Sequence, residues 1–139
     1  MSTKHIIVLV GLPGSGKSTF CKKADYANYL RISQDEQGKE GCKKIFEVGL
    51  SQGVNIIVDR CNFNREQRAR YLKPAKKAGY KTTIIWLPIN AENCIERINQ
   101  RTEHPNLCKG NEKIESVVRM FDNMFVEPYW DEADEVIKL

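Results

Sequence analysis

Residues 11–19 read GLPGSGKST, and this short stretch restricts the fold of the chain more than any other part of it. It fits the pattern G-x-x-x-x-G-K-[S/T], in which a glycine-rich turn leads from a buried strand into a helix. An apolar run at residues 5–10 precedes it, and residues 17–28 have a helical pattern. The sequence therefore predicts a phosphate-binding loop (P-loop) at the carboxyl end of the first strand.

The composition of the loop predicts how it binds a nucleoside triphosphate. Glycines let backbone N–H groups turn toward anionic oxygens, and the start of the following helix adds partial positive charge. Lys17 is expected to contact the β- and γ-phosphates, and the Ser18 hydroxyl is the expected ligand of Mg²⁺. We predict that ATP or another nucleoside triphosphate binds at Gly11, Pro13, Gly14, Ser15, Gly16, Lys17, Ser18 and Thr19.

Apolar runs and helical patterns alternate along the rest of the chain. Further strands are expected at 29–32, 54–58, 82–87 and 133–139, and further helices at 35–50, 65–78, 91–102 and 112–125. Strands separated by helices predict an α/β P-loop kinase fold, with a five-stranded parallel sheet of order 2-3-1-4-5, helices on both faces and a short lid. Pro74 predicts a kink or an early break in its helix. The length of 139 residues favours a single domain over residues 1–139.

The net charge and the cysteine content indicate which partners and which cellular compartment suit this chain. The net charge of +4 permits an anionic partner without requiring one. Five scattered cysteines without a C-x-x-C pair argue against a zinc site or a disulfide framework and favour a reducing compartment, the cytoplasm or the nucleus. The first apolar run is too short for a signal peptide, and no stretch approaches the roughly 20 apolar residues of a membrane span.

Acidic residues follow two other predicted strands. Ligands of parallel α/β sheets bind at the carboxyl ends of the strands, where the P-loop also lies. Asp35, past the second strand, is a candidate base for an attacking hydroxyl, although an acid at a helix start is also common for electrostatic reasons. Asp59, at the end of the third strand, can hold a Mg²⁺-bound water or orient Asn62 and the acceptor, or simply cap the next turn.

The stretches GLPGSGKST, ISQDE and VDRCNFNREQR resemble the P-loop polynucleotide 5′-hydroxyl kinases, the end-healing enzymes of phages and bacteria. VDRCNF is also similar to the kinase-like modules of some aprataxin-type proteins. The resemblance implies that Lys17 and Ser18 act on phosphates and magnesium and that Asp35 is the general base. It also implies a lid arginine that stabilises the transferring phosphoryl group. Arg101 is the preferred candidate, and Arg97, on the same helix face, is expected to bind the nucleotide; the alternative is that both belong to an exposed face.

The chain departs from the phage-type enzymes just after Asp35. Where those enzymes have an arginine for the acceptor phosphate, this sequence reads DEQG, so Arg31, Lys39 or Arg60 would have to substitute. We expect the acceptor path to be lined by Asp59, Arg60 and Asn62 and continued as a positive wall by Arg65 and Arg68.

The sequence thus favours transfer of a phosphoryl group from ATP to a 5′-hydroxyl end of RNA or DNA. Three other functions are compatible with the same residues: a small-molecule kinase of this fold, a nucleotide-gated nucleic-acid-binding module without turnover, and a regulatory ATPase. The resemblance also allows a phosphatase or ligase partner in a repair pathway.

Overall fold

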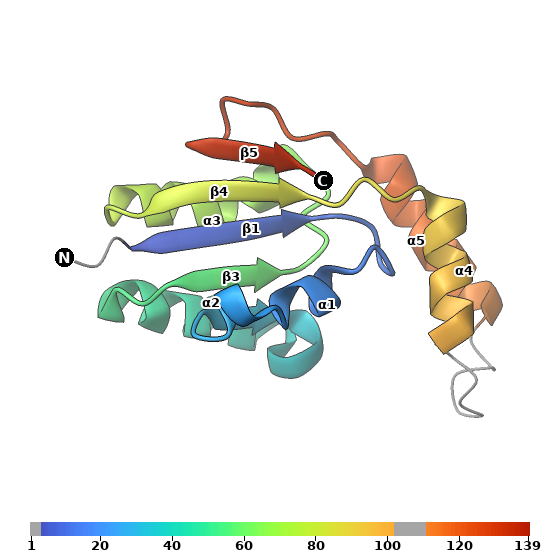
Figure 1. Ribbon diagram of the computed structural model, residues 1–139, viewed down its shortest axis with the longest axis horizontal. Helices are drawn as coiled ribbons and strands as arrows, with labels where there is room; N and C mark the ends of the chain where they lie inside the picture. Colours follow the sequence, from blue (N-terminus) through green and yellow to red (C-terminus); the bar gives the residue numbers. More distant parts are fainter. Residues whose placement is uncertain (1–3, 102–110) are drawn as a thin grey trace.

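A five-stranded parallel sheet of order β2-β3-β1-β4-β5 forms the centre of the molecule (Figure 1). The computed structural model describes residues 4–101 and 111–139, except the side chains of Ala24, Gln34, Asp35, Glu36, Lys39, Arg101, Asn111, Glu112 and Lys113. The strands are β1 (His5–Val10), β2 (Leu30–Ser33), β3 (Ile56–Asp59), β4 (Lys81–Trp86) and β5 (Glu135–Lys138). All neighbouring strands are parallel, which confirms the predicted sheet and its order.

The helices lie on both faces of the sheet and beyond one edge. They are α1 (Lys17–Cys21), α2 (Gln34–Gln52), α3 (Arg65–Lys77), α4 (Ala91–Arg101) and α5 (Asn111–Met124), with a short 3₁₀ helix at Ala24–Tyr26. In Figure 1, α1 lies in front of the sheet and α3 behind it, while α4 and α5 lie together past the carboxyl ends of the strands. The P-loop and the helices α4 and α5 therefore all lie at the carboxyl ends of the strands.

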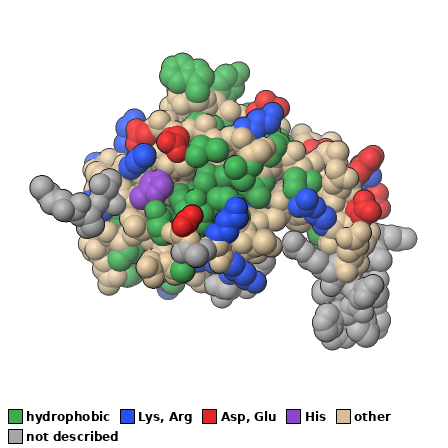
Figure 2. Space-filling model, in the orientation of Figure 1, with side chains coloured by type: hydrophobic (Ala, Val, Ile, Leu, Met, Phe, Trp, Pro, Cys, Tyr) green, Lys and Arg blue, Asp and Glu red, His purple; other side chains and the backbone are tan. Residues whose placement is uncertain are grey.

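The two faces of the sheet are covered unequally. Side chains of α2 and α3, including Phe46, Tyr71 and Leu72, pack with Val8 and Val58 in the larger core. On the α1 side, Phe20 and Cys21 cover Ile7, Leu9 and Ile57, and Ile137 is only partly buried. Figure 2 shows that face, with hydrophobic side chains gathered over its centre. Both sides of β1 are buried, so this strand fixes the P-loop rigidly.

The structure corrects two expectations about helices. The predicted helix 17–28 ends at Cys21, because the chain turns back to stack Tyr26 on Phe20 with ring centroids 5.1 Å apart. The helix containing Pro74 continues to Lys77, so the predicted early break is wrong. Pro74 lies on the exposed side of α3, where water can satisfy the carbonyl that lacks its usual helical donor. Within the described part of the chain, no helix has the length and apolar character to cross a bilayer.

Candidate active site

Two glycines shape the P-loop between β1 and α1. Gly16 caps α1 in a left-handed conformation with φ of 101°, which side chains other than glycine rarely adopt. A Cβ on Gly14 would lie 2.7 Å from the carbonyl oxygen of Cys94, so α4 can approach the loop only because this residue has no side chain. The backbone N–H of Gly11 donates to the carbonyl of Cys61 at 3.2 Å, which joins the loop to the segment after β3. The loop is therefore supported from both sides.

Lys17 lies folded over this loop. Its ammonium group donates to the carbonyl oxygens of Gly11 at 3.0 Å and Leu12 at 2.8 Å, and the residue is only 8% exposed. These contacts place the charge inside the curve of the loop before any phosphate arrives. A bound phosphate group would meet an ammonium that is already positioned, which lowers the reorganisation that binding requires.

Ser18 meets the acid at the end of β3. Its hydroxyl donates to Asp59 Oδ2 at 3.1 Å, and the Asp59 side chain is 4% exposed. The guanidinium of Arg31, from β2, donates to the same carboxylate oxygen through Nη2 at 2.5 Å and Nε at 3.0 Å. Asp59 thus lies beside the P-loop. It accepts hydrogen bonds from both the Ser18 hydroxyl and the Arg31 guanidinium, and the three side chains form one cluster.

The oxygen atoms of Ser18 and Asp59 fit a hard divalent cation. Mg²⁺ prefers oxygen ligands and is usually bound by one or two protein groups, with water and phosphate completing an octahedron. Among the residues described, no group of three or more His, Cys, Asp and Glu side chains is arranged to hold a metal without such help. Ser18 and Asp59 would therefore hold Mg²⁺ only together with nucleotide phosphates and water.

The turn from β2 into α2 carries Asp35. Ser33 lies opposite Asp59 in the sheet, so Asp35, the second residue of α2, follows two residues beyond this pair, at the same end of the strands as the P-loop. The Gln37 side chain clamps the turn by accepting from the Ser33 N–H at 3.0 Å and donating to the Arg31 carbonyl at 2.9 Å. The side chain of Asp35 lies outside the described set, so its role as a base stays a prediction.

The α4 helix brings one predicted arginine to the loop. Asn90 caps α4 by accepting from the N–H of Asn93 at 2.8 Å. Arg97 is exposed, and its Nη1 lies 3.8 Å from where a Cβ of Gly16 would be, which is the position expected of a nucleotide contact. Arg101 ends α4, but its side chain is not described, so the predicted phosphoryl contact remains untested.

The predicted acceptor wall is largely wrong. Asn62 is 2% exposed and does not line a cleft, because its amide donates to the carbonyls of Leu9 and Arg60. Arg60 turns toward α3, where its Nη1 donates to the Tyr71 hydroxyl at 2.7 Å. Asn62 has a positive φ of 48°, so it shapes the turn after β3 instead of contacting a ligand.

The two remaining residues of that wall differ from one another. Arg68 is fully buried and pairs with Glu132 at 2.8 Å, so it cannot form part of a positive surface. Arg65 is exposed, but it pairs with Asp131 at 3.1 Å, which offsets part of its charge. Of these two residues, Arg65 is the one that can still contact a nucleic acid as predicted.

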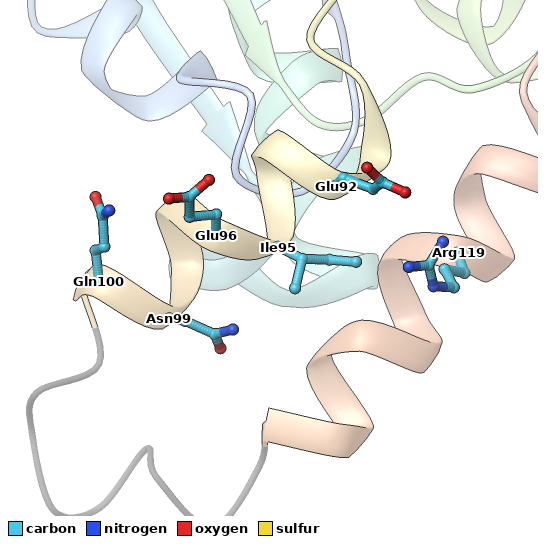
Figure 3. A pocket seen from close by; sticks show the side chains of 6 residues that line it. All are labelled: Glu92, Ile95, Glu96, Asn99, Gln100 and Arg119. Carbon is cyan, nitrogen blue, oxygen red and sulfur yellow. The ribbon is translucent and has the colours of Figure 1, made fainter.

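Two hollows lie near this edge of the sheet. One, of about 560 Å³, lies between α4 and α5, where Ile95 points toward Arg119 and two glutamates supply negative charge (Figure 3). It opens on a side of α4 different from the one that touches the P-loop, and its acids do not suit phosphate. The other, of about 270 Å³, adjoins Gly11 at the ends of β4 and β5 and includes Trp86 and Phe125. Sequence reasoning did not predict this second hollow, because both aromatic residues fit a core pattern.

The described cysteines are held as thiols. Burial raises the pKa of Cys21 to about 12, and burial also raises the pKa values of Cys42, Cys61 and Cys94. At pH 8, only about one Cys21 side chain in ten thousand would be a thiolate. In a Cys108→Ser variant, which removes the cysteine outside the described residues, we expect alkylating reagents to label the folded chain slowly and the urea-unfolded chain rapidly. Fast labelling of Cys21 in the folded chain, identified by mass spectrometry, would contradict this assignment.

Comparison with known proteins shows the family of this chain. The family model described as AAA domain matches residues 36–124, more than half of the chain. The chain belongs to this AAA domain family. The match covers the segment from α2 to α5, and the P-loop of this AAA domain protein precedes it.

Two relatives are similar in sequence to this AAA domain protein, over alignments of different length. "Transcription factor bHLH140" of Arabidopsis thaliana is 34% identical over an alignment of 127 residues that covers 85% of this chain and 14% of that protein. "Putative bifunctional polynucleotide phosphatase/kinase" of Acanthamoeba polyphaga mimivirus is 38% identical over 79 residues, 55% of this chain and 19% of that protein. The chain therefore spans less than a fifth of the length of either relative.

A solved structure supports the fold independently. A gluconokinase from Sinorhizobium meliloti superimposes with a TM-score of 0.65 at 17% identity, covering 100% of this chain and 83% of that chain. At this identity the likeness shows only the fold, which is that of a P-loop kinase. The predicted fold class is confirmed.

Proposed function

We propose that this chain transfers the γ-phosphate of ATP to a 5′-hydroxyl end of RNA or DNA. The observation that carries the proposal is the hydrogen bond from Ser18 of the P-loop to Asp59, at the strand ends where α2 begins with Gln34 and Asp35. The mimivirus relative, whose name includes a polynucleotide kinase, favours a nucleic-acid acceptor over a small metabolite. In the proposal, residues 1–139 act as one catalytic domain, and a phosphatase or ligase activity would come from a partner.

On the side of the site that would bind ATP, positively charged side chains lie close to the P-loop. Lys17 would exchange its loop carbonyls for the β- and γ-phosphate oxygens, and the exposed guanidinium of Arg97 would approach the nucleotide from α4. Ser18 and Asp59 would hold Mg²⁺, which neutralises charge on the phosphates when it is bound. Arg101 is proposed to stabilise the transferring phosphoryl group from the end of α4.

On the acceptor side, the proposal depends on Asp35 and on one basic residue, Arg65. Asp35 would accept the proton of the attacking hydroxyl, in line with the departing nucleotide. Arg65 lies at the start of α3, directly after the segment that follows β3, and would contact the backbone of the strand whose end is phosphorylated. Its partner Asp131 would have to release it, so we expect only a modest contribution from this contact.

Replacing the proposed base tests the chemistry of the acceptor side. In Asp35→Asn we expect turnover to fall by about 10²- to 10⁴-fold, because an amide has a similar shape but cannot accept the proton. The affinity for ATP, measured by equilibrium titration, should stay close to that of the unmodified chain. Transfer would be followed with radiolabelled ATP and a 5′-hydroxyl oligonucleotide.

The matched control for this variant is Asp25→Asn, the same change at an exposed acid in the 3₁₀ helix. We expect it to retain full turnover. An Asp35→Asn chain as active as this control would refute the assignment of Asp35 as the base.

A further inference from the structure

Arg31 occupies the position beside Ser18 and Asp59 that a metal ion would need. It lies in the edge strand β2, opposite Ile57, and its side chain reaches across the end of β3. Its Nη2 is 2.5 Å from Asp59 Oδ2 and 3.3 Å from Ser18 Oγ, and its Nε is 3.0 Å from the same carboxylate oxygen. One guanidinium therefore bridges the two oxygens that fit Mg²⁺.

These contacts occupy the carboxylate oxygen of Asp59 that lies next to Ser18. Asp59 Oδ2 accepts three hydrogen bonds, two from Arg31 and one from the Ser18 hydroxyl. A carboxylate oxygen has about two lone-pair sites, so this atom is already saturated. A dication bound to Ser18 Oγ would also lie within a few ångströms of the guanidinium, where like charges repel strongly because the carboxylate is almost buried.

The surroundings of Arg31 allow its side chain to move while its backbone stays fixed. The backbone carbonyl of Arg31 is held by Gln37 Nε2 at 2.9 Å, and β2 pairs along its whole length with β3. The side chain itself is 25% exposed, against 4% for Asp59. A displaced guanidinium could therefore turn toward solvent without disturbing the sheet.

We propose that Arg31 is a built-in counter-cation that competes with Mg²⁺ for Ser18 and Asp59 and so sets how much divalent metal the site requires. The inference rests on the proposed function only in taking the ligand to be a metal–nucleotide complex. In this structure Arg31 neutralises Asp59 and donates to both Ser18 of α1 and Asp59 of β3. Binding of the complex exchanges this monovalent cation for a divalent one at the same oxygens.

The test compares Mg²⁺ binding in Arg31 variants without any phosphoryl transfer. Mg²⁺ would be titrated calorimetrically into protein saturated with a non-hydrolysable ATP analogue. Arg31→Met removes the charge and keeps much of the side-chain volume, and we expect it to lower the apparent Kd for Mg²⁺ by about tenfold, the scale of one charge-assisted contact. Arg31→Lys keeps the positive charge but not the planar guanidinium with its several donors. Its apparent Kd for Mg²⁺ should lie between those of Arg31→Met and the unmodified chain.

Arg119→Met is the matched control, because Arg119 pairs only with Glu115 on the exposed face of α5 in the contacts described. We expect it to leave the Kd for Mg²⁺ unchanged. If Arg31→Met bound Mg²⁺ as the control does, or more weakly, Arg31 would be a support for Asp59 and the competition would be refuted. A lowered Kd together with no transfer to any nucleic acid would uphold this inference while removing the proposed acceptor.

Discussion

Lys17→Ala is expected to abolish phosphoryl transfer, with a loss of at least about 10³-fold in kcat/KM. Lys17 supplies the positive charge inside the P-loop, where its ammonium already lies within 3.0 Å of the Gly11 carbonyl and 2.8 Å of the Leu12 carbonyl. In a buried position this charge interacts with phosphate oxygens in a medium of low dielectric constant, so its loss is not made up by water. Transfer rates with radiolabelled ATP measure the effect.

The control for this variant is Lys22→Ala, an exposed lysine that follows α1. It should transfer at the unmodified rate. Because Lys17 also satisfies loop carbonyls, the melting temperature of each variant has to be recorded. A stable, correctly folded Lys17→Ala chain with normal transfer would mean that the P-loop does not carry the reaction.

Arg68→Met is expected to destabilise the fold by about 3–5 kcal/mol, the usual result of removing one partner from a buried ion pair. The Arg68 and Glu132 side chains are 0% and 3% exposed. Arg68 also donates to the carbonyls of Asn62 at 3.0 Å and Val126 at 2.8 Å, so the variant would leave a buried carboxylate without its cation and remove a donor from two carbonyls. Urea unfolding followed by circular dichroism measures the loss.

The same helix offers a nearly ideal control. Arg65, one turn earlier, pairs with Asp131, but those side chains are 55% and 47% exposed. Arg65→Met should therefore leave the free energy of unfolding nearly unchanged. Adding Glu132→Gln to Arg68→Met should recover part of the loss, since the uncompensated charge is removed. Equal losses for Arg65→Met and Arg68→Met would contradict the description of Arg68 as a buried anchor.

The topology was predictable because its signals are local and repeated. Short apolar runs such as residues 5–10 and 54–58 can be buried on both faces only in a covered parallel sheet, and the P-loop fixes which strand lies centrally. The neighbourhood of Ser18 and Asp59 followed from the same rule, because parallel strands place their carboxyl ends at one edge. These predictions needed no knowledge of distant contacts.

The predicted acceptor wall failed because charge alone does not show which way a side chain points. In α3 the buried residues are Arg68, Tyr71, Leu72 and Ala75, a spacing of three and four that marks the inner stripe of a helix. That spacing is visible in the sequence and was the signal that could have placed Arg68 on the inner stripe. Its partner Glu132 lies 64 residues further along the chain, so the pairing itself could not be inferred locally.

The most direct test of the central claim is a label-transfer assay with γ-labelled ATP, Mg²⁺ and matched oligonucleotides. RNA and DNA of one sequence would be supplied with either a 5′-hydroxyl or a 5′-phosphate end. The proposed function predicts that label appears on 5′-hydroxyl ends, is absent from 5′-phosphate ends, and is lost in Asp35→Asn. Intact binding of ATP without label on any oligonucleotide would contradict the claim.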